Sequence, residues 1–280
     1  MSLERVENLV LGAGIAGLGA GYELCRNKRE CLVLERNSSY GGLLDNFTID
    51  GFRFDKFIHL SFTNNEEVRR IFDKTPYITH KPLSYNYYKG YWLKHPAQNN
   101  IFPLPSEEKK KIIDGFKNRC TKSPNDIVNY EEWLRHQYGD YFAENFPLVY
   151  TKKYWTVEAK ELGTTWVGSR MYKPSIEEIQ KGSETDETPN TYYAKEMRYP
   201  KRGGYKSFLE PLVEGLDIRY GQKVVSIDLK NKIVQTSSGN LFQYKNIINT
   251  IPMPEFVALV KNVPEEVKLA SQALRFTSGA

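Results

Sequence analysis

The sequence predicts an α/β fold in which a sheet flanked by helices is interrupted by a mainly helical insertion. Three observations support this prediction. A segment typical of a short buried strand at residues 6–11 is followed at once by a glycine-rich turn and a helix-like pattern. Residues 106–172 carry apolar side chains at three- and four-residue spacings, as helices do. Short apolar runs typical of strands return between residues 217 and 251.

The strand at 6–11 leads into the glycine loop, Gly12–Gly17, which reads Gly-Ala-Gly-Ile-Ala-Gly. Each glycine of this spacing has a physical role. Gly12 allows a tight turn, Gly14 lets a pyrophosphate approach the backbone, and Gly17 lets the helix pack closely on the strand. The amino end of that helix offers N–H groups and a partial positive charge to phosphates. The pattern therefore predicts a Rossmann-like dinucleotide-binding domain.

A second apolar run, Cys31–Leu34, ends in an acid at the distance that this domain requires. Glu35 lies 18 residues after Gly17, where its carboxylate would accept hydrogen bonds from the ribose hydroxyls of the nucleotide. An acid at this place also disfavours NADP, because the 2′-phosphate would be repelled.

Composition and charge restrict the classes of function. Of the 280 residues, 40% are hydrophobic and 26% charged, so the chain can form one or two domains. The net charge of +5 suits an anionic ligand, and we expect no nucleic-acid partner. No apolar run reaches the roughly 18 residues of a membrane-spanning helix. Cys25, Cys31 and Cys120 match no metal or disulfide spacing, which favours a cytoplasmic protein without a metal site.

The middle of the chain predicts a separate domain. We expect a first part of the nucleotide-binding domain at 1–80, an inserted helical and hairpin substrate domain at 81–197, and a second part at 198–280. The predicted elements of the insertion are a hairpin at 85–93, helices at 106–118, 124–138, 141–150 and 164–172, and a polar loop at 182–190. Helices are also predicted at 65–74 and 206–216, and an extended segment at 56–62. Strands at 217–220, 223–229, 232–236, 241–244 and 246–251 should rejoin the N-terminal sheet.

Two glycines after the acid favour FAD over NAD. Gly41 and Gly42 lie six and seven residues after Glu35. This pair resembles the second signature of the FAD-dependent amine oxidase superfamily, which includes protoporphyrinogen oxidases, carotene desaturases and UDP-galactopyranose mutases. In those proteins the Gly-Gly turn runs near the flavin and the pyrophosphate, where glycine lets a bulky ring system lie against the backbone.

The order of segments resembles UDP-galactopyranose mutases along nearly the whole chain. Phe57–Asn64 looks like the mutase segment Gly-Ala-His-Ile-Phe-His-Thr-Asn, with Phe62 in place of the second histidine. Tyr150–Trp155 is similar to the mutase Tyr-Thr-x-Lys-x-Trp. Tyr199–Tyr205 resembles the family's Pro-x-Gly-Gly-Tyr turn, and Thr250–Pro252 its Thr-Gly-Pro at the end of a cofactor-side strand.

The resemblance implies a set of site residues. His59 would be catalytic and would contact the cofactor. The other residues implied to bind FAD are Gly12, Gly14, Ile15, Ala16, Gly17, Glu35, Arg36, Gly41, Gly42, Leu43, Val224 and Thr250. Those implied to bind the substrate are Tyr150, Trp155, Arg170 and Tyr193.

The function that the resemblance implies is the interconversion of sugar ring size on a nucleotide-sugar in lipopolysaccharide or other cell-surface polysaccharide biosynthesis. Mutases use reduced FAD as a nucleophile toward the anomeric carbon, with no net redox change. The partner would be a UDP-sugar or another small molecule, and a homodimer is allowed. Two alternatives stay open. One is an oxidoreductase of the amine oxidase or protoporphyrinogen oxidase type, and the other is a non-catalytic nucleotide-binding remnant.

One departure from the family concerns the end of the chain. In this superfamily a C-terminal segment returns to the nucleotide-binding domain and covers the flavin ring. The sequence stops at residues 275–280, at what looks like the start of a strand. We therefore expect about a third of a usual family member to be missing, and weak FAD binding as a consequence.

Overall fold

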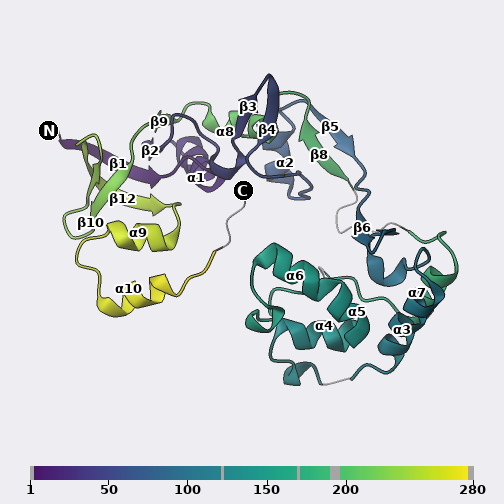
Figure 1. Ribbon diagram of the computed structural model, residues 1–280. Coiled ribbons are helices and arrows are strands. Elements are labelled where there is room, and N and C mark those ends of the chain that lie inside the picture. Colours follow the sequence, from purple (N-terminus) through teal and green to yellow (C-terminus); the bar gives the residue numbers. More distant parts are fainter. Residues whose placement is uncertain (1–2, 121–122, 169–170, 190–195, 277–280) are drawn as a thin grey trace. The chain divides into compact units, whose positions relative to one another are not determined.

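The computed structural model describes residues 3–120, 123–168, 171–189 and 196–276, which divide into two compact units (Figure 1). Unit 1 comprises residues 1–80 and 197–280, and unit 2 comprises residues 81–196. Each unit has its own hydrophobic core. In the described residues no helix is both long and apolar enough to cross a membrane.

Unit 1 is built on a six-stranded sheet with the order β10-β11-β12-β1-β2-β9. Its strands are β1 (Leu3–Leu11), β2 (Cys31–Leu34), β9 (Asp217–Arg219), β10 (Val224–Asp228), β11 (Ile233–Thr236) and β12 (Leu241–Asn249). The four strands from β12 to β9 run parallel, and β10 and β11 are antiparallel to their neighbours. The C-terminal strands thus enter the N-terminal sheet on both sides of the pair β1–β2, which confirms the predicted Rossmann-like fold class.

Both faces of this sheet are covered, as the consecutive apolar residues Leu9–Leu11 of β1 and Cys31–Leu34 of β2 predict for central parallel strands. Val10 and Val33 belong to a core on the face that also holds α1 (Ile15–Arg26) and α8 (Glu210–Val213). Leu11 and Leu34 belong to a core on the other face, together with residues of β10, β11 and β12. Successive side chains of a strand point to opposite faces. The four-residue strand β2 therefore contributes Val33 to one core and Leu34 to the other.

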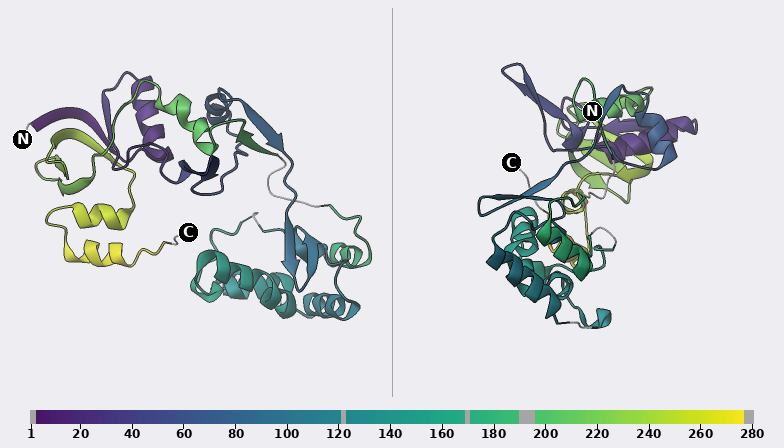
Figure 2. Two further views of the ribbon diagram at one scale, coloured as in Figure 1. Left: turned by 45° about the horizontal axis from the view of Figure 1, so that its top comes forward. Right: turned by 90° about the vertical axis from the view of Figure 1, so that its right-hand side faces the viewer.

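The other elements of unit 1 are short. They are β3 (Asn46–Ile49), β4 (Phe52–Asp55), α2 (Glu66–Phe72), β5 (Tyr77–His80), β8 (Met197–Pro200), α9 (Met253–Leu259) and α10 (Glu265–Gln272), with 3-10 turns at Gly42–Leu44 and Tyr205–Leu209. The strands β5 and β8 pair antiparallel, so the chain leaves unit 1 and re-enters it along one two-stranded ribbon. The helices α9 and α10 pack side by side (Figure 2).

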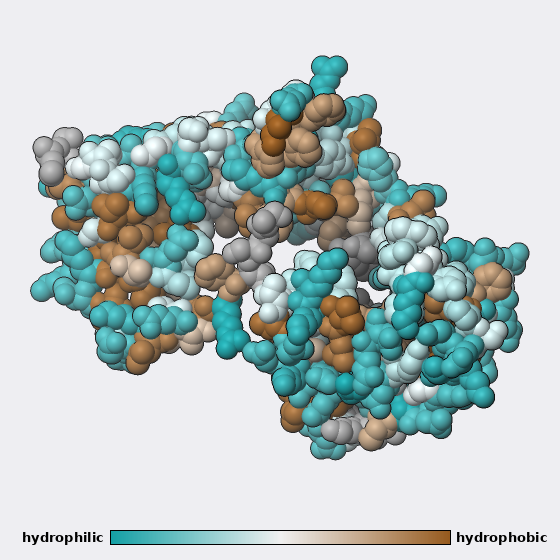
Figure 3. All heavy atoms as spheres, viewed as in Figure 1, coloured by the Kyte–Doolittle hydropathy of each residue, from teal (hydrophilic) through white to brown (hydrophobic). Residues whose placement is uncertain are grey.

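The β3–β4 hairpin turns its polar face inward and its apolar face outward. Asn46 Nδ2 donates a hydrogen bond to the Gly203 carbonyl (2.8 Å) on the inner side. On the outer side the cross-strand partners Phe47 and Phe54 stack with ring centroids 5.7 Å apart. Phe52 near the tip is 71% exposed. Hydrophobic residues are therefore visible on the surface over this hairpin (Figure 3).

Unit 2 is a helical domain with one hairpin. Its elements are β6 (Tyr85–Tyr88), β7 (Tyr91–Lys94), α3 (Ser106–Lys117), α4 (Tyr130–Tyr138), α5 (Asp140–Asn145), α6 (Pro147–Trp155) and α7 (Ile176–Glu184), with 3-10 turns at Ala97–Asn99, Pro124–Asp126 and Ala159–Glu161. The hairpin predicted at 85–93 is confirmed: β6 and β7 pair antiparallel, and the turn between them, Lys89-Gly90, has positive φ at both residues. Asn129 caps α4 by accepting from the Glu132 amide (3.0 Å).

Three predictions in unit 2 were wrong in detail. The helix expected at 141–150 breaks at Phe146 because Pro147, which has no N–H, starts a new helix there. The loop expected from Gly182 is still helical, because a capping box between Ser175 and Glu178 starts α7, which runs to Glu184. The helix expected at 124–138 begins only at Tyr130, after a 3-10 turn.

The helix expected at 164–172 does not form in the residues that the structure describes there. Residue 164 is a bend and residues 165–168 form a turn, in which Gly168 has a φ of +47°. Two threonines and a glycine are weak helix formers, and Trp166 bonds its indole N–H to the Gly163 carbonyl instead (2.7 Å). The apolar spacing was therefore misleading at this segment.

In unit 1 the main differences concern segments that pair over long distances. The two strands predicted at 241–244 and 246–251 are one strand, β12, because it pairs with β1 along nearly its whole length. The helix predicted at 206–216 is a 3-10 turn followed by the short α8. The extended segment predicted at 56–62 has only an isolated bridge, from Ser61 to Arg198.

Candidate nucleotide-binding site

The glycine loop joins the end of β1 to the start of α1. The Gly12 amide donates to the Leu34 carbonyl (2.8 Å), so the loop begins as an extension of the sheet. Gly12 has a φ of +98°, a region that other residues adopt only with strain. A Cβ on Gly17 would lie 1.9 Å from the Gly12 carbonyl oxygen. Close packing of helix and strand therefore requires glycine at both positions.

Gly14 differs from its two neighbours in the motif. Its φ of −73° is ordinary, and a Cβ placed on it would meet nothing within 4 Å. Gly14 is the N-cap of α1 and supplies no side-chain hydrogen bond to the helix. The first backbone N–H groups of a helix lack partners within the helix. The loop thus combines open space with N–H donors and the positive end of a helix dipole, which is the geometry of an anion site.

The Gly-Gly turn lies directly against this loop. The Gly41 amide donates to the Ala13 carbonyl (2.8 Å), and Gly41 forms an isolated parallel bridge with Gly14. Gly41 and Gly42 have φ values of +114° and +57°. A Cβ on Gly42 would lie 3.3 Å from the Gly14 Cα. The two glycine segments, 24 or more residues apart in sequence, therefore form one backbone surface.

Glu35 is buried and is hydrogen-bonded to the glycine loop. It is 5% exposed. Its Oε2 accepts from the Ala13 amide and its Oε1 from the Asn37 amide, both at 2.8 Å. A carboxylate has about four acceptor sites, so two hydrogen bonds leave capacity for a ligand hydroxyl. The Gln222 amide donates to the Glu35 carbonyl (2.9 Å), which brings the segment before β10 next to the acid. Val224, the first residue of β10, packs against the core that contains Leu34.

Thr250, which directly follows β12, packs against the start of the glycine loop. Its Oγ1 donates to the Leu11 carbonyl (2.7 Å). A Cβ on Gly12 would lie 3.1 Å from the same hydroxyl. Thr250 is thus a structural neighbour of the loop through both contacts, although it lies 238 residues after Gly12.

The other residues implied to bind FAD lie at the surface around the loop. Ile15 and Ala16 occupy the exposed first turn of α1. Leu43 follows the Gly-Gly turn and is also exposed. Arg36 forms an ion pair with Glu255 (3.4 Å), and both side chains are mostly exposed.

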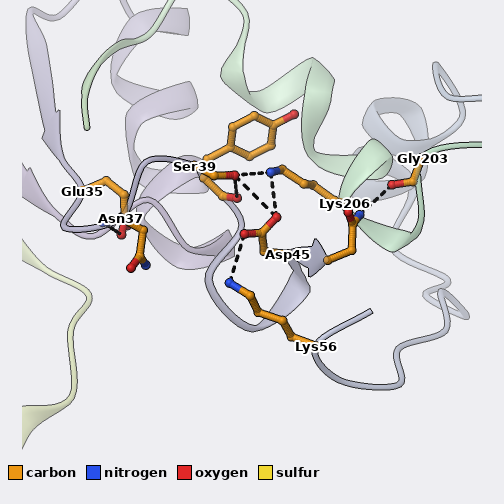
Figure 4. A network of polar contacts seen from close by, with 9 residues as sticks. Glu35, Asn37, Ser39, Asp45, Lys56, Gly203 and Lys206 are labelled. Carbon is orange, nitrogen blue, oxygen red and sulfur yellow. Dashed lines mark hydrogen bonds and ion pairs between the residues drawn. The ribbon is translucent and has the colours of Figure 1, made fainter. Parts of the chain in front are cut away.

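A polar network ties the segment after Glu35 to the 3-10 turn at Tyr205–Leu209 (Figure 4). Asp45 accepts from Lys206 Nζ (2.7 Å) and from Lys56 Nζ (3.0 Å). Burial alone would raise the pKa of Asp45, but the hydrogen bonds from Lys206 and Lys56 outweigh it, so that the pKa is lowered. Lys206 also donates to Ser39 Oγ. Sequence reasoning missed Asp45 and Lys206.

His59 lies outside this network. Its Nδ1 is 2.9 Å from the Phe57 carbonyl oxygen, and its ring centroid is 5.5 Å from that of Tyr205. Because a carbonyl only accepts, Nδ1 carries the proton in this contact. In the neutral ring Nε2 is then the nitrogen that can accept a hydrogen bond from a ligand.

In unit 2, Tyr150 and Trp155 belong to an exposed aromatic surface. We define it as Tyr150, Tyr154, Trp155 and Trp166. Tyr150 stacks on Tyr154 (5.6 Å, 13° between rings), and Trp155 lies 5.3 Å from Tyr154 and 6.1 Å from Trp166. Tyr150 is 62% exposed and Trp155 39%. The rings contact one another and keep accessible faces, as a stacking platform requires. Arg170 and Tyr193 lie outside the described residues.

Comparison with known proteins agrees with this geometry. The model of the NAD(P)-binding Rossmann-like domain family matches residues 10–75, which include the glycine loop, Glu35 and the Gly-Gly turn. An inactive all-trans-retinol 13,14-reductase from Danio rerio is 42% identical over 52 residues, which are 19% of this chain and 9% of that protein.

The similarity to solved structures extends over both units. The crystal structure of reduced UDP-galactopyranose mutase matches 96% of this chain with a TM-score of 0.86 and 25% identity. A putative protoporphyrinogen oxidase from Exiguobacterium matches 96% with a TM-score of 0.65 and 18% identity. Wild-type putrescine oxidase bound to putrescine matches 97% with a TM-score of 0.65 and 15% identity.

This chain covers 60% of the mutase chain and 64% of each of the other two. It therefore spans less than two thirds of the structures that it matches. Residues 10–75 match the Rossmann-like domain family, and the chain has the fold seen in the structures of UDP-galactopyranose mutase, putrescine oxidase and the putative protoporphyrinogen oxidase.

Proposed function

We propose that unit 1 binds FAD and that the protein is a flavoenzyme of the UDP-galactopyranose mutase type. The observation that carries this proposal is the bridge between Gly14 and Gly41. A glycine loop by itself serves NAD and FAD equally. A second glycine turn against the first extends the backbone surface, and this suits a cofactor with a large ring system beyond its pyrophosphate.

The residues of the loop suit the ADP half of the cofactor. The pyrophosphate would lie over Gly14, where the backbone is open, and accept from the N–H groups at the start of α1. The Glu35 carboxylate would accept from the ribose hydroxyls with the sites that Ala13 and Asn37 leave unused. Ile15, Ala16, Arg36, Leu43 and Val224 surround this place.

The substrate of the proposed enzyme is a nucleotide-sugar. The enzyme would act in lipopolysaccharide or other cell-surface polysaccharide biosynthesis. When bound and reduced, FAD would supply the nucleophile for the interconversion of sugar ring size. The aromatic surface, with Tyr150 and Trp155, would stack on the base or the sugar. Arg170 and Tyr193 are proposed as further substrate contacts. His59 would offer its Nε2 as an acceptor near the reacting groups.

One observation favours a second candidate, an FAD-dependent oxidoreductase. The mutase segment has a second histidine where this chain has Phe62, which is 43% exposed. An apolar side chain at that place suits an apolar substrate. The similarity to putrescine oxidase and to a putative protoporphyrinogen oxidase agrees with this candidate at the level of fold.

A titration with FAD and then with UDP tests the proposal. We expect the full chain to quench the fluorescence of added FAD and to shift the flavin spectrum when UDP is added, more strongly in the reduced state than in the oxidised state. Binding of FAD without any response to UDP in either state would contradict the mutase and favour the oxidoreductase. A folded protein that binds no FAD would contradict both and favour a non-catalytic role.

A further inference from the structure

One lysine connects the segment before the Gly-Gly turn with the segment after it. Lys206 Nζ donates to Ser39 Oγ and to Asp45 Oδ1, the latter at 2.7 Å, and lies 4.5 Å from the Tyr40 ring centroid. Lys206 is about 160 residues downstream and comes from the 3-10 turn that follows the return of the chain from unit 2 (Figure 4). It therefore holds both ends of the loop that contains Gly41.

The backbone of Asp45, in turn, packs closely against Gly41 of the Gly-Gly turn. A Cβ on Gly41 would lie 3.2 Å from the Asp45 amide nitrogen and 3.3 Å from its Cα. The Leu44 amide donates to the Gly41 carbonyl (2.9 Å), and the Gly41 amide donates to Ala13 (2.8 Å). A continuous series of contacts thus runs from Lys206 through Asp45 and Gly41 to the glycine loop.

A second lysine provides an internal comparison. Lys56 also donates to Asp45, at the other oxygen and at 3.0 Å. The Lys56 side chain is 39% exposed, whereas that of Lys206 is 20% and that of Asp45 10%. Ion pairs at the surface contribute little, and removal of one partner of a buried pair costs much more. Moreover, within the described residues the Lys56 ammonium makes no hydrogen bond to Ser39 and does not lie over the Tyr40 ring, as Lys206 does. The two lysines carry equal charge but hold different parts of the loop.

We propose that Lys206 is a positioning residue for the cofactor: its pairing with Asp45 and Ser39 holds the Gly-Gly turn against Gly14, so that the pyrophosphate meets a preformed surface. This inference rests on the proposed function, because the ligand of that surface is the dinucleotide. A preformed site saves the ordering of the loop on binding. Loss of the Lys206 contacts should therefore weaken FAD binding although Lys206 lies outside the glycine motifs.

The test uses the full chain with Lys206→Met, Lys206→Arg and the matched control Lys56→Met. Two quantities are measured: hydrogen exchange of the amides of residues 39–45 without cofactor, and the dissociation constant for FAD. Lys206→Met should speed exchange and weaken FAD binding, each about tenfold, as expected for a lost charge-assisted hydrogen bond. Lys56→Met should change either by less than about threefold, and Lys206→Arg should restore most of the loss.

The proposal would be overturned if Lys206→Met kept the wild-type exchange rates and FAD affinity. It would also be overturned if Lys56→Met changed both quantities as much as Lys206→Met does. If Lys206→Met does not fold, Asp45→Asn removes the same ion pair at nearly constant volume and should show the same two changes. A folded wild type that binds no FAD would overturn the proposed function. Faster hydrogen exchange in Lys206→Met would, in that case, still support the role of Lys206 in fixing the position of the Gly-Gly turn.

Discussion

The glycine loop of unit 1 and the aromatic surface of unit 2 offer two different ways to bind a ligand. The loop presents backbone atoms whose positions are fixed by close packing, as at Gly17. The aromatic surface offers side chains that pack mainly on one another and remain exposed, as at Tyr150 and Trp155. Substitutions at the tightly packed glycines of the loop should therefore change stability and binding together, whereas substitutions on the aromatic surface should change binding with only a small effect on stability.

The largest expected effect is that of Gly17→Ala. Its new Cβ would lie 1.9 Å from the Gly12 carbonyl oxygen, so helix and strand must separate. We expect a loss of about 3 kcal/mol in the free energy of unfolding, at the upper end of the usual cost of overpacking. Urea unfolding followed by circular dichroism measures it. A stability loss below about 0.5 kcal/mol would contradict the packing described for the loop.

The next effect is that of Glu35→Ala. It leaves the amides of Ala13 and Asn37 without their acceptor. Each unsatisfied buried donor costs about 1 kcal/mol or more, so the free energy of unfolding should fall by about 2 kcal/mol. Glu35→Gln is the control, because it keeps the shape and one acceptor oxygen and should lose about half as much. Equal stability of the two variants would show that the acceptor role is unimportant.

A smaller effect should follow from acidification. The pKa of Asp45 is lowered in the folded protein by Lys206 and Lys56, against the effect of burial. The stability from this group is therefore fully present above the unfolded pKa of about 3.9 and is lost as the pH falls through the lower folded value. Asp45→Asn should remove this part of the decline below about pH 5. Unfolding curves of the wild type and Asp45→Asn that fall in parallel with pH would contradict it.

The smallest effect on stability should be that of Trp155→Ala. The side chain is 39% exposed and packs beside Tyr154 and Trp166. We expect a loss of about 0.5–1.5 kcal/mol in the free energy of unfolding, the range for one aromatic pair. FAD affinity should be unchanged, and UDP binding should be about tenfold weaker. Val128→Ala, at an exposed site of the same unit, is the control. Wild-type UDP binding in Trp155→Ala would remove this residue from the proposed substrate site.

The sequence was most informative where a residue type has one steric purpose. Gly12 and Gly17 predicted the turn and the close packing because no other residue fits there. The resemblance implies a Gly-Gly turn near the pyrophosphate, and this stays a prediction; the bridge between Gly14 and Gly41 shows that the turn lies against the glycine loop. The contribution of the C-terminal strands to the sheet followed from their apolar runs.

Contacts between distant residues could not be predicted from local patterns. Nothing in the neighbourhood of Asp45 indicates that Lys206 is its partner, and the pairing of β5 with β8 joins two segments without a strong strand pattern. Apolar spacing also failed at Thr164–Gly168, where backbone preference opposed it. The roles of His59, Tyr150 and Trp155 stay predictions, because they depend on ligands and not on packing.

The most direct test of the account compares FAD binding by the wild type and Gly14→Ala. A Cβ at Gly14 meets nothing within 4 Å in the protein and its φ is ordinary, so the variant should fold with wild-type stability. The added methyl group would occupy the place proposed for the pyrophosphate. We predict that FAD affinity falls by about tenfold or more, since a steric clash of 1.4 kcal/mol already gives that factor. Undiminished FAD binding by a folded Gly14→Ala variant would contradict the proposed site.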